Sequence, residues 1–248
     1  MKTIFLVTWI ALAGSALWAE DVDQLRKQAN SKIRSGEFGQ AHRLLSRAIK
    51  AEPMTASLYY QRGRLNFQRG KMAESVKDFD AYVKLEPGVA SRQWERGIAL
   101  YYAGDFKRGA AQFELYQTFH DNDVENSVWR FLCMVPTDGV EESREVMLPI
   151  KDDRRIPMMK VYEMFRGTAT PEQVLANVRM DDPAPEVLVG RLFYAHLYLG
   201  LYLEATGKKD EGRRYIALAA DKKLKTNPRI NHYMWEVARI HHELKGKK

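Results

Sequence analysis

Small, apolar and proline residues recur along the first half of the chain at a fixed interval of 34 residues. The recurring sets are Gly36, Gly70 and Gly104; Phe38, Met72 and Phe106; Leu45, Phe79 and Phe113; and Pro53 with Pro87. Each glycine stands where a helix must end, because glycine readily adopts the left-handed conformation that is common at helix C-termini. The chain then reverses into a second helix, whose inner face carries the set that begins with Leu45. The interval predicts three helical hairpins, with helices near 22–35 and 38–51, 56–69 and 72–85, and 90–103 and 106–119.

Two sets of residues set the packing and the length of each hairpin. Ala29, Gly63 and Gly97 are small residues midway through the first helices, where they let the partner helix approach closely. Pro53 and Pro87 lack an N–H and cannot continue a helix, so each marks the end of a unit. A single hairpin cannot bury its apolar stripe, whereas stacked hairpins can. We therefore predict an all-α solenoid with three regular units over residues 20–121.

The regular spacing fades between residues 122 and 188. Pro136 is expected to interrupt the next first helix, and Pro149 and Pro157 to break the helices that follow. Segments with one apolar side remain at 141–147, 158–165 and 171–177. The last of these begins with the helix-start signal Thr170-Pro171-Glu172-Gln173. We interpret this block as degenerate helical repeats.

The pattern returns in a late unit over residues 189–226. Gly200 and Gly207 stand at its small-residue and turn positions, and Gly207 follows Gly104 by 103 residues, three intervals plus one. The spacing therefore predicts six units in all. A final helix at 228–245, within a basic C-terminal segment 227–248, is expected to cap the open end of the stack. Its inner side would carry Ile230, Met234, Val237 and Ile240, and its outer side Arg229, Glu236, His242 and Lys245.

Residues 1–19 have the pattern of a secretory signal peptide. Lys2 precedes an apolar run, and small residues lead to Ala19 before the acidic Glu20. The uncharged stretch 3–19 is shorter than the roughly 20 apolar residues that a membrane-spanning helix needs. We expect cleavage after Ala19 and export to the periplasm or cell envelope, or secretion. An uncleaved signal kept as a membrane anchor is the alternative, and only then would the protein associate with a membrane through it.

Composition and charge agree with a helical globular protein that carries a basic C-terminal third. The chain is 45% hydrophobic and 29% charged, and removal of residues 1–19 takes away one lysine, leaving 38 basic against 32 acidic residues, or +6. The basic residues gather at 208–209, 213–214, 222–225 and 245–248. A solvated helix surface is one interpretation, and a module that binds an anionic envelope polymer or a membrane surface is the other. Cys133 is the single cysteine, which excludes an intrachain disulfide and a cysteine-rich zinc site.

The 34-residue interval, with these residues in its columns, resembles the tetratricopeptide repeat (TPR) family. The resemblance implies a concave groove, lined by the first helices, that binds a peptide or a helix of a partner protein. The groove residues it implies are Arg26, Asn30, Arg34, Tyr60, Arg64, Phe67, Trp94, Ile98, Tyr101 and Tyr102, with Ile33 beside them. Tyrosine, tryptophan and arginine often dominate binding energy. The alternative is that residues such as Phe67 and Tyr101 only pack between adjacent repeats.

Some TPR domains hold the C-terminal carboxylate of a chaperone with basic residues and asparagines. Arg26 and Asn30 match two positions of that clamp. Gln61, Ser91 and Glu95 do not match the others, and Glu95 has the wrong charge to bind a carboxylate. We therefore do not predict this clamp.

The order of segments, from a signal through regular repeats and a degenerate middle to a closing repeat, also resembles the NlpI-type lipoproteins of the bacterial envelope. The most specific part lies in residues 160–205. This resemblance implies a homodimeric adaptor that brings a protease and its cell-wall-hydrolase client together. The chain departs from it because no lipidation cysteine follows the signal.

No set of residues in the sequence forms a catalytic motif. His232 and Glu236 are one helical turn apart and could share a metal, but no HExxH sequence is present, and nucleophile-elbow, phosphate-loop and dinucleotide signatures are missing too. A helical hydrolase that depends on His232 is the weakest hypothesis. We expect no enzyme activity, no metal, no cofactor and no nucleic-acid partner, and interpret the protein as an exported scaffold or adaptor.

Overall fold

The computed structural model describes residues 21–245, with side chains up to residue 244, so the predicted signal peptide lies outside the described residues. The described residues form helices and no β-strand, which confirms the all-α prediction. They divide into two compact units, one ending at Met54 and one beginning at Thr55. No helix among residues 21–245 has the length and apolar content needed to cross a membrane.

The first unit is a single hairpin of α1 (Val22–Arg34) and α2 (Phe38–Ala51). The Asp21 carboxylate starts α1 by accepting a hydrogen bond from the backbone N–H of Gln24 at 3.0 Å. Gly36 turns the chain with a φ of 76°, as the spacing predicts. Ala29 and Leu45 are fully buried where the two helices meet.

Two regular hairpins open the second unit: α3 (Ala56–Gln68) with α4 (Met72–Leu85), and α5 (Trp94–Ala103) with α6 (Phe106–Gln117). The small-residue positions are needed for close packing. A Cβ atom on Gly63 would lie 3.2 Å from the Phe79 ring, and one on Gly97 would lie 2.6 Å from the Phe113 ring. Each glycine therefore faces the aromatic residue of its own second helix.

The third hairpin begins later than its predicted start at residue 90. Residues Pro87–Arg92 form a short 3₁₀ helix, η1, and α5 starts only at Trp94. The Gln112 side chain donates a hydrogen bond to the carbonyl of Ala90 at 2.8 Å and so fixes η1 to α6. Periodicity alone does not reveal this contact, whose partners are 22 residues apart in the sequence.

The degenerate block forms α7 (Val124–Asp138), α8 (Val140–Glu145), α9 (Met158–Phe165) and α10 (Pro171–Asn177). The helices predicted at 158–165 and 171–177 are confirmed, and Thr170 and Gln173 form the expected reciprocal cap. The prediction that Pro136 interrupts its helix is wrong, since α7 runs two residues past it. Pro136 lies in the last turn of α7, so the missing N–H removes only one hydrogen bond near the helix end.

The late unit is α11 (Pro185–Ala205) with α12 (Lys209–Ala219), followed by a 3₁₀ turn, η2 (Lys222–Leu224), and the last helix, α13 (His232–Lys245). A Cβ atom on Gly200 would lie 2.6 Å from Ile216 of α12, so this glycine has the packing role predicted for it. The described residues contain six consecutive helix pairs, from α1–α2 to α11–α12, followed by the single helix α13, and six is the number of units that the spacing predicts.

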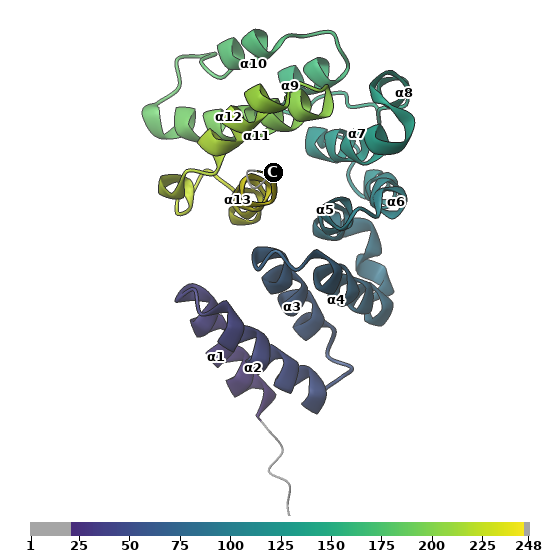
Figure 1. Cartoon of the computed structure of the whole chain (residues 1–248), viewed down its shortest axis with the longest axis vertical. Coiled ribbons are helices and arrows are strands. Elements are labelled where there is room, and N and C mark those ends of the chain that lie inside the picture. Colours follow the sequence, from purple (N-terminus) through teal and green to yellow (C-terminus); the bar gives the residue numbers. More distant parts are fainter. Residues whose placement is uncertain (1–20, 246–248) are drawn as a thin grey trace, which may run out of the picture. The chain divides into compact units, whose positions relative to one another are not determined.

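The position of α13 differs from that of a simple cap at the end of the stack. It packs on α12, and it also lies against the first helices α3 and α5 (Figure 1). The Tyr233 ring stacks on Phe67 of α3 with centroids 4.9 Å apart, and Arg239 donates to the carbonyl of Gln68 at 2.6 Å. The amphipathic pattern of α13 predicted that one side is buried, but not that the burying surface includes helices more than 130 residues away in the sequence.

Two details of α13 were predicted wrongly. The helix begins at His232 instead of residue 228, because the side chains of Asn227 and Asn231 accept hydrogen bonds from the backbone N–H groups of Arg229 and Tyr233 and form turns there. Glu236, expected on the outer side, is only 2% exposed. Its carboxylate is neutralised by Arg239, one turn along, at 2.7 Å.

Candidate binding surface

In the second unit, the first helices α3, α5 and α11 contact α13, and we call the side that they present to it the inner face. His241 of α13 bridges two of these helices: its Nδ1 lies 2.8 Å from the Tyr102 hydroxyl, and its Nε2 lies 3.0 Å from the Glu204 carboxylate. The chain's own last helix therefore occupies part of the surface on which the TPR resemblance places the partner.

Four of the predicted groove residues are buried in the protein or pack against its other helices. Phe67 and Ile98 are fully buried. Tyr102 contacts His241, and the Tyr101 ring packs edge-on against Trp129 with centroids 5.5 Å apart. In this arrangement, Phe67 and Tyr101 have the packing role that was the alternative interpretation of these residues.

Three other predicted residues, Tyr60, Arg64 and Trp94, remain partly exposed. The Arg64 guanidinium lies over the rings of Tyr60 and Tyr233, 5.7 Å and 5.4 Å from their centroids, and its side chain is 39% exposed. Its Nε is 3.5 Å from Oε1 of Glu95. We call Tyr60, Arg64, Glu95 and Tyr233 the Arg64 cluster.

The carboxylate of the Arg64 cluster is unusual because it is buried with only one close cation. Glu95 is 5% exposed, and its Oε2 has no hydrogen-bond partner. Burial raises the pKa of Glu95, and this outweighs the opposing effects of the Arg64 charge and the Tyr60 hydroxyl. The cluster thus presents a cationic side chain on an aromatic support, beside an acceptor oxygen that is not used within the protein.

The remaining predicted groove residues belong to the first unit and are described within it. Arg26, Asn30 and Arg34 are four residues apart along α1 and so share one face of that helix. Arg26 and Asn30 are half-buried, whereas Arg34 is exposed. This row borders the buried side of α1, because Val22, four residues before Arg26, is itself buried.

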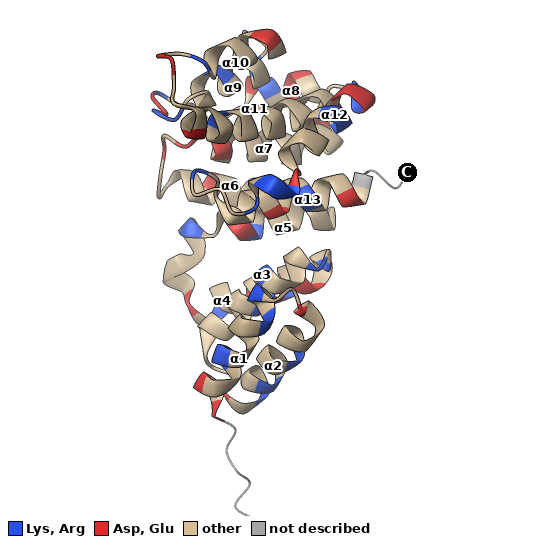
Figure 2. Ribbon diagram, turned by 90° about the vertical axis from the view of Figure 1, so that its left-hand side faces the viewer, with Lys and Arg blue, Asp and Glu red and all other residues tan. Residues whose placement is uncertain are grey.

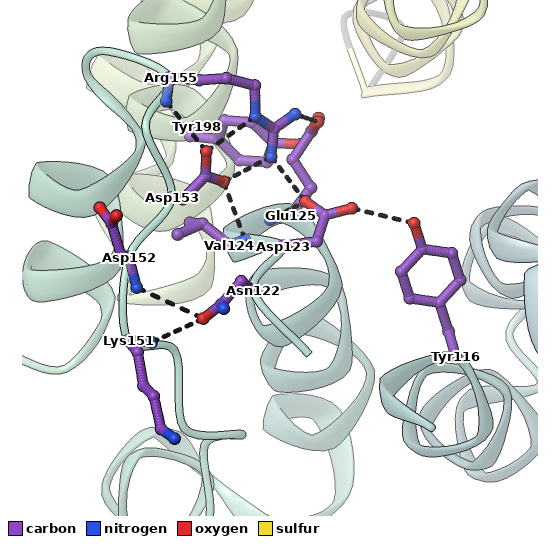
Figure 3. Close-up of polar contacts among 10 residues, drawn as sticks. All are labelled: Tyr116, Asn122, Asp123, Val124, Glu125, Lys151, Asp152, Asp153, Arg155 and Tyr198. Carbon is purple, nitrogen blue, oxygen red and sulfur yellow. Dashed lines mark hydrogen bonds and ion pairs between the residues drawn. The ribbon is translucent and has the colours of Figure 1, made fainter. Parts of the chain in front are cut away.

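A second polar feature, not predicted from the sequence, lies where the loop 149–157 meets the start of α7. Arg155 forms ion pairs with Asp123 at 2.6 Å, Glu125 at 2.6 Å and Asp153 at 2.5 Å (Figure 3). We call these four residues the Arg155 cluster. One guanidinium therefore faces three carboxylates.

Local backbone contacts hold the Arg155 cluster in place. Asp123 is the N-cap of α7 and accepts from the backbone N–H of Glu125 at 3.1 Å, while Asp153 accepts from the backbone N–H of Val124 at 3.1 Å. The carboxamide of Asn122 accepts from the backbone N–H groups of Lys151 and Asp152, at 3.1 Å and 3.3 Å (Figure 3). Two segments about 30 residues apart are thus fixed to each other.

The pKa values of Glu125 and Asp153 are shifted in opposite directions. Burial, followed by the charge of Asp123, raises the pKa of Glu125, whose Oε1 accepts a hydrogen bond from Tyr198 at 2.5 Å. For Asp153 burial also favours the neutral form, but the hydrogen bonds and charge of Arg155 outweigh it and the pKa is lowered. Asp153 is therefore the firmly ionised partner of Arg155.

A cleft of about 180 Å³ opens beside the Arg155 cluster. Aromatic and polar side chains line it: Trp94, Phe113, Tyr116, Asp123, Glu125, Asn126, Trp129, Arg155, Asn231 and Met234. Trp94 is the one predicted groove residue among them. The signals that could have suggested Asp123, Glu125 and Arg155 are the acid-rich segment 121–125 and the charged segment 151–155. Nothing in the sequence spacing pairs these two segments.

On α12 and α13, basic residues of the C-terminal third lie close to acidic ones. On α12, Lys209 is followed by Asp210 and Glu211, and Arg213 pairs with Asp210 at 3.2 Å. Figure 2 shows both charge signs on α12 and on α13.

Residues 21–245 include no group of three or more histidine, cysteine or acidic side chains that could hold a metal ion. His232 lies 3.9 Å from Glu236 without a third ligand of that kind. Cys133 is buried, and burial raises the pKa of its thiol, so it is a poor nucleophile.

Comparison with known proteins supports the repeat architecture where the spacing is most regular. Residues 26–90 match the tetratricopeptide repeat family. The match covers most of α1 and continues through α2, α3 and α4 into η1. TPR proteins stack such hairpins into surfaces that bind other proteins. No curated protein matches the chain.

Proposed function

We propose that the protein is a non-catalytic TPR scaffold that binds a peptide or helix of a partner protein along the accessible edge of its inner face. The observation that carries this proposal is the Arg64 cluster. Its arginine is partly exposed on two tyrosine rings, and beside it a buried carboxylate oxygen has no partner. Tyrosine and arginine are the side chains most enriched where a few residues carry most of the binding energy.

A partner segment would find complementary chemistry at this edge. Arg64 can donate to backbone carbonyls or to a carboxylate of the segment, while Tyr60 offers flat apolar area at low entropic cost. The unpartnered Oε2 of Glu95 can accept a backbone or side-chain N–H. His232, whose side chain is 48% exposed, borders the same edge from α13.

The proposal is tested by capturing partners from an extract of the source cells and then measuring their binding directly. We expect Tyr60→Ala combined with Arg64→Ala to weaken the identified partner at least about tenfold, because hot-spot truncations typically cost about 2 kcal/mol or more. Tyr215→Ala combined with Arg214→Ala, on α12, is the matched control. Equal affinity of the two double variants for the partner would defeat this site assignment.

Export and the class of partner are further parts of the proposal. They are supported by the signal pattern of residues 1–19 and by the resemblance to envelope protease adaptors. In this proposal the mature protein begins at Glu20, acts in the periplasm or cell envelope, forms a homodimer and holds a protease with its client. Cell fractionation with mass measurement of the mature N-terminus tests export. Capture of a protease by wild type but not by the Tyr60/Arg64 variant tests the adaptor role.

A further inference from the structure

We infer that the cleft beside the Arg155 cluster receives the guanidinium of an arginine side chain on the bound partner segment. The inference rests on the proposed function, since it assigns one side chain of the segment to one place on the inner face. It starts from an imbalance of charge. Asp123 and Glu125 are the two carboxylates that line the cleft, and Arg155, which also pairs with Asp153 outside the lining, is the only cation among the lining residues.

A buried hydrogen-bond acceptor in the same cleft is a second, independent observation in favour of an arginine site. Asn126 is 3% exposed and lines the cleft, and its Nδ2 donates to Gln117 at 2.8 Å. Its Oδ1 has no hydrogen-bond partner in the protein. A buried amide oxygen without a partner costs free energy, so a ligand that donates to it is favoured.

The walls of the cleft suit a flat cation. Trp94, Phe113, Tyr116 and Trp129 contribute to its lining. A planar guanidinium stacks on aromatic faces and donates to several acceptors in one plane, which an ammonium group does less well. The volume of about 180 Å³ corresponds to about six water molecules at liquid density, which suits one long side chain and excludes a whole peptide segment.

Contacts connect the cleft to the proposed binding edge. The Tyr233 ring lies under Arg64 and also packs edge-on against Trp94, with the two ring centroids 5.3 Å apart. Trp94 in turn lines the cleft. A segment bound at the Arg64 cluster can therefore direct one side chain past Trp94 toward Asp123 and Asn126.

The test uses the mature protein and N-acetyl-arginine amide as the probe, with the indole N–H resonances of Trp94 and Trp129 as the NMR readout. We expect saturable shifts of both resonances. N-acetyl-citrulline amide is the strict control, because its neutral urea group has the same shape and could pair with both the Asn126 oxygen and the unpartnered Nε1 of Trp129. Citrulline should bind about tenfold more weakly, since hydrogen bonds to charged groups are about twice as strong as neutral ones.

Variants locate the probe within the protein. Asp123→Asn should weaken the arginine probe about tenfold, whereas Asp121→Asn, an equal charge change at an exposed position, should leave it unchanged. If Asp123→Asn does not fold by circular dichroism, Glu125→Gln provides the same test and keeps an acceptor for Tyr198. The lysine analogue should bind more weakly than the arginine probe.

Three results would overturn the inference: equal binding of the arginine and citrulline probes, tighter binding of N-acetyl-glutamate amide, or equal effects of the 121 and 123 variants. Its failure is distinguishable from failure of the proposed function. If the Tyr60/Arg64 variant loses the partner while no probe enters the cleft, the scaffold function stands and only the arginine site is wrong.

Discussion

The two arginine clusters of the second unit contrast in their charge balance and in how the chain builds them. In the Arg64 cluster one guanidinium faces one carboxylate at 3.5 Å and lies on two tyrosine rings. In the Arg155 cluster one guanidinium faces three carboxylates at 2.5–2.6 Å. The Arg155 cluster therefore holds two segments of the fold together, whereas the Arg64 cluster leaves its arginine available at the surface.

Replacing the arginine of each cluster should give the largest difference in stability between the two clusters. Arg155→Met leaves three carboxylates close together, including Asp153 with 4% of its side chain exposed, so we expect a loss of about 3 kcal/mol in the free energy of unfolding. Arg64→Met leaves one carboxylate whose raised pKa eases protonation, so we expect a loss of about 1 kcal/mol. Urea unfolding at neutral pH measures both.

Exposed arginines provide the matched controls for that pair. Arg154, next to Arg155, has 91% of its side chain exposed and lies 3.5 Å from Asp152. Arg154→Met should change the free energy of unfolding by less than about 0.5 kcal/mol. A loss from Arg64→Met as large as that from Arg155→Met would contradict the assignment of different roles to the two clusters.

The stability that the Asp153 carboxylate contributes should depend on pH in the opposite sense from the contribution of Glu95, which is buried and weakly paired. Its lowered pKa means that its contribution to stability is present above the unfolded value of 3.8 and is lost as pH falls through the lowered native pKa. We expect Asp153→Asn to cost about 2 kcal/mol at neutral pH, where the ion pair with Arg155 is complete. The difference between wild type and variant should shrink below about pH 4, as followed by thermal unfolding over a pH series. A difference that is constant with pH would show that Asp153 acts through shape alone.

The same contrast explains which features could be predicted from the sequence. Helices such as 158–165 and 171–177 follow from local signals, because turns, caps and one-sided apolar patterns act within a few residues. The Gly63–Phe79 and Gly97–Phe113 contacts recur with the repeat and so are visible as periodicity. Most of the fold could therefore be predicted from local and periodic features of the sequence.

Features that depend on distant segments could not be predicted in this way. The Arg155 cluster pairs residues 30 and 32 positions apart within the block that lacks periodicity. The position of α13 depends on a contact between Phe67 and Tyr233, and no pattern in the sequence links these two residues. The pairing of Glu236 with Arg239, in contrast, had a local signal, a three-residue spacing on one helix.

Replacing Glu95 should give the smallest change in stability, with a pH dependence opposite to that expected at Asp153. Its raised pKa means that its contribution to stability is fully present below the unfolded value of 4.5 and is lost as pH rises through the higher native pKa. Glu95→Gln is neutral at every pH, so its stability relative to wild type should improve as pH rises from about 5 to about 8, the reverse of the trend expected at Asp153.

The Glu95 measurement compares unfolding curves of wild type and Glu95→Gln in urea across that pH range. Glu74→Gln, at an exposed position on α4, is the control and should give a constant difference from wild type. If stability of Glu95→Gln instead falls relative to wild type with rising pH, the ion pair with Arg64 dominates over burial. Arg64 would then be committed to Glu95, as Arg155 is to Asp153, and less available to a partner.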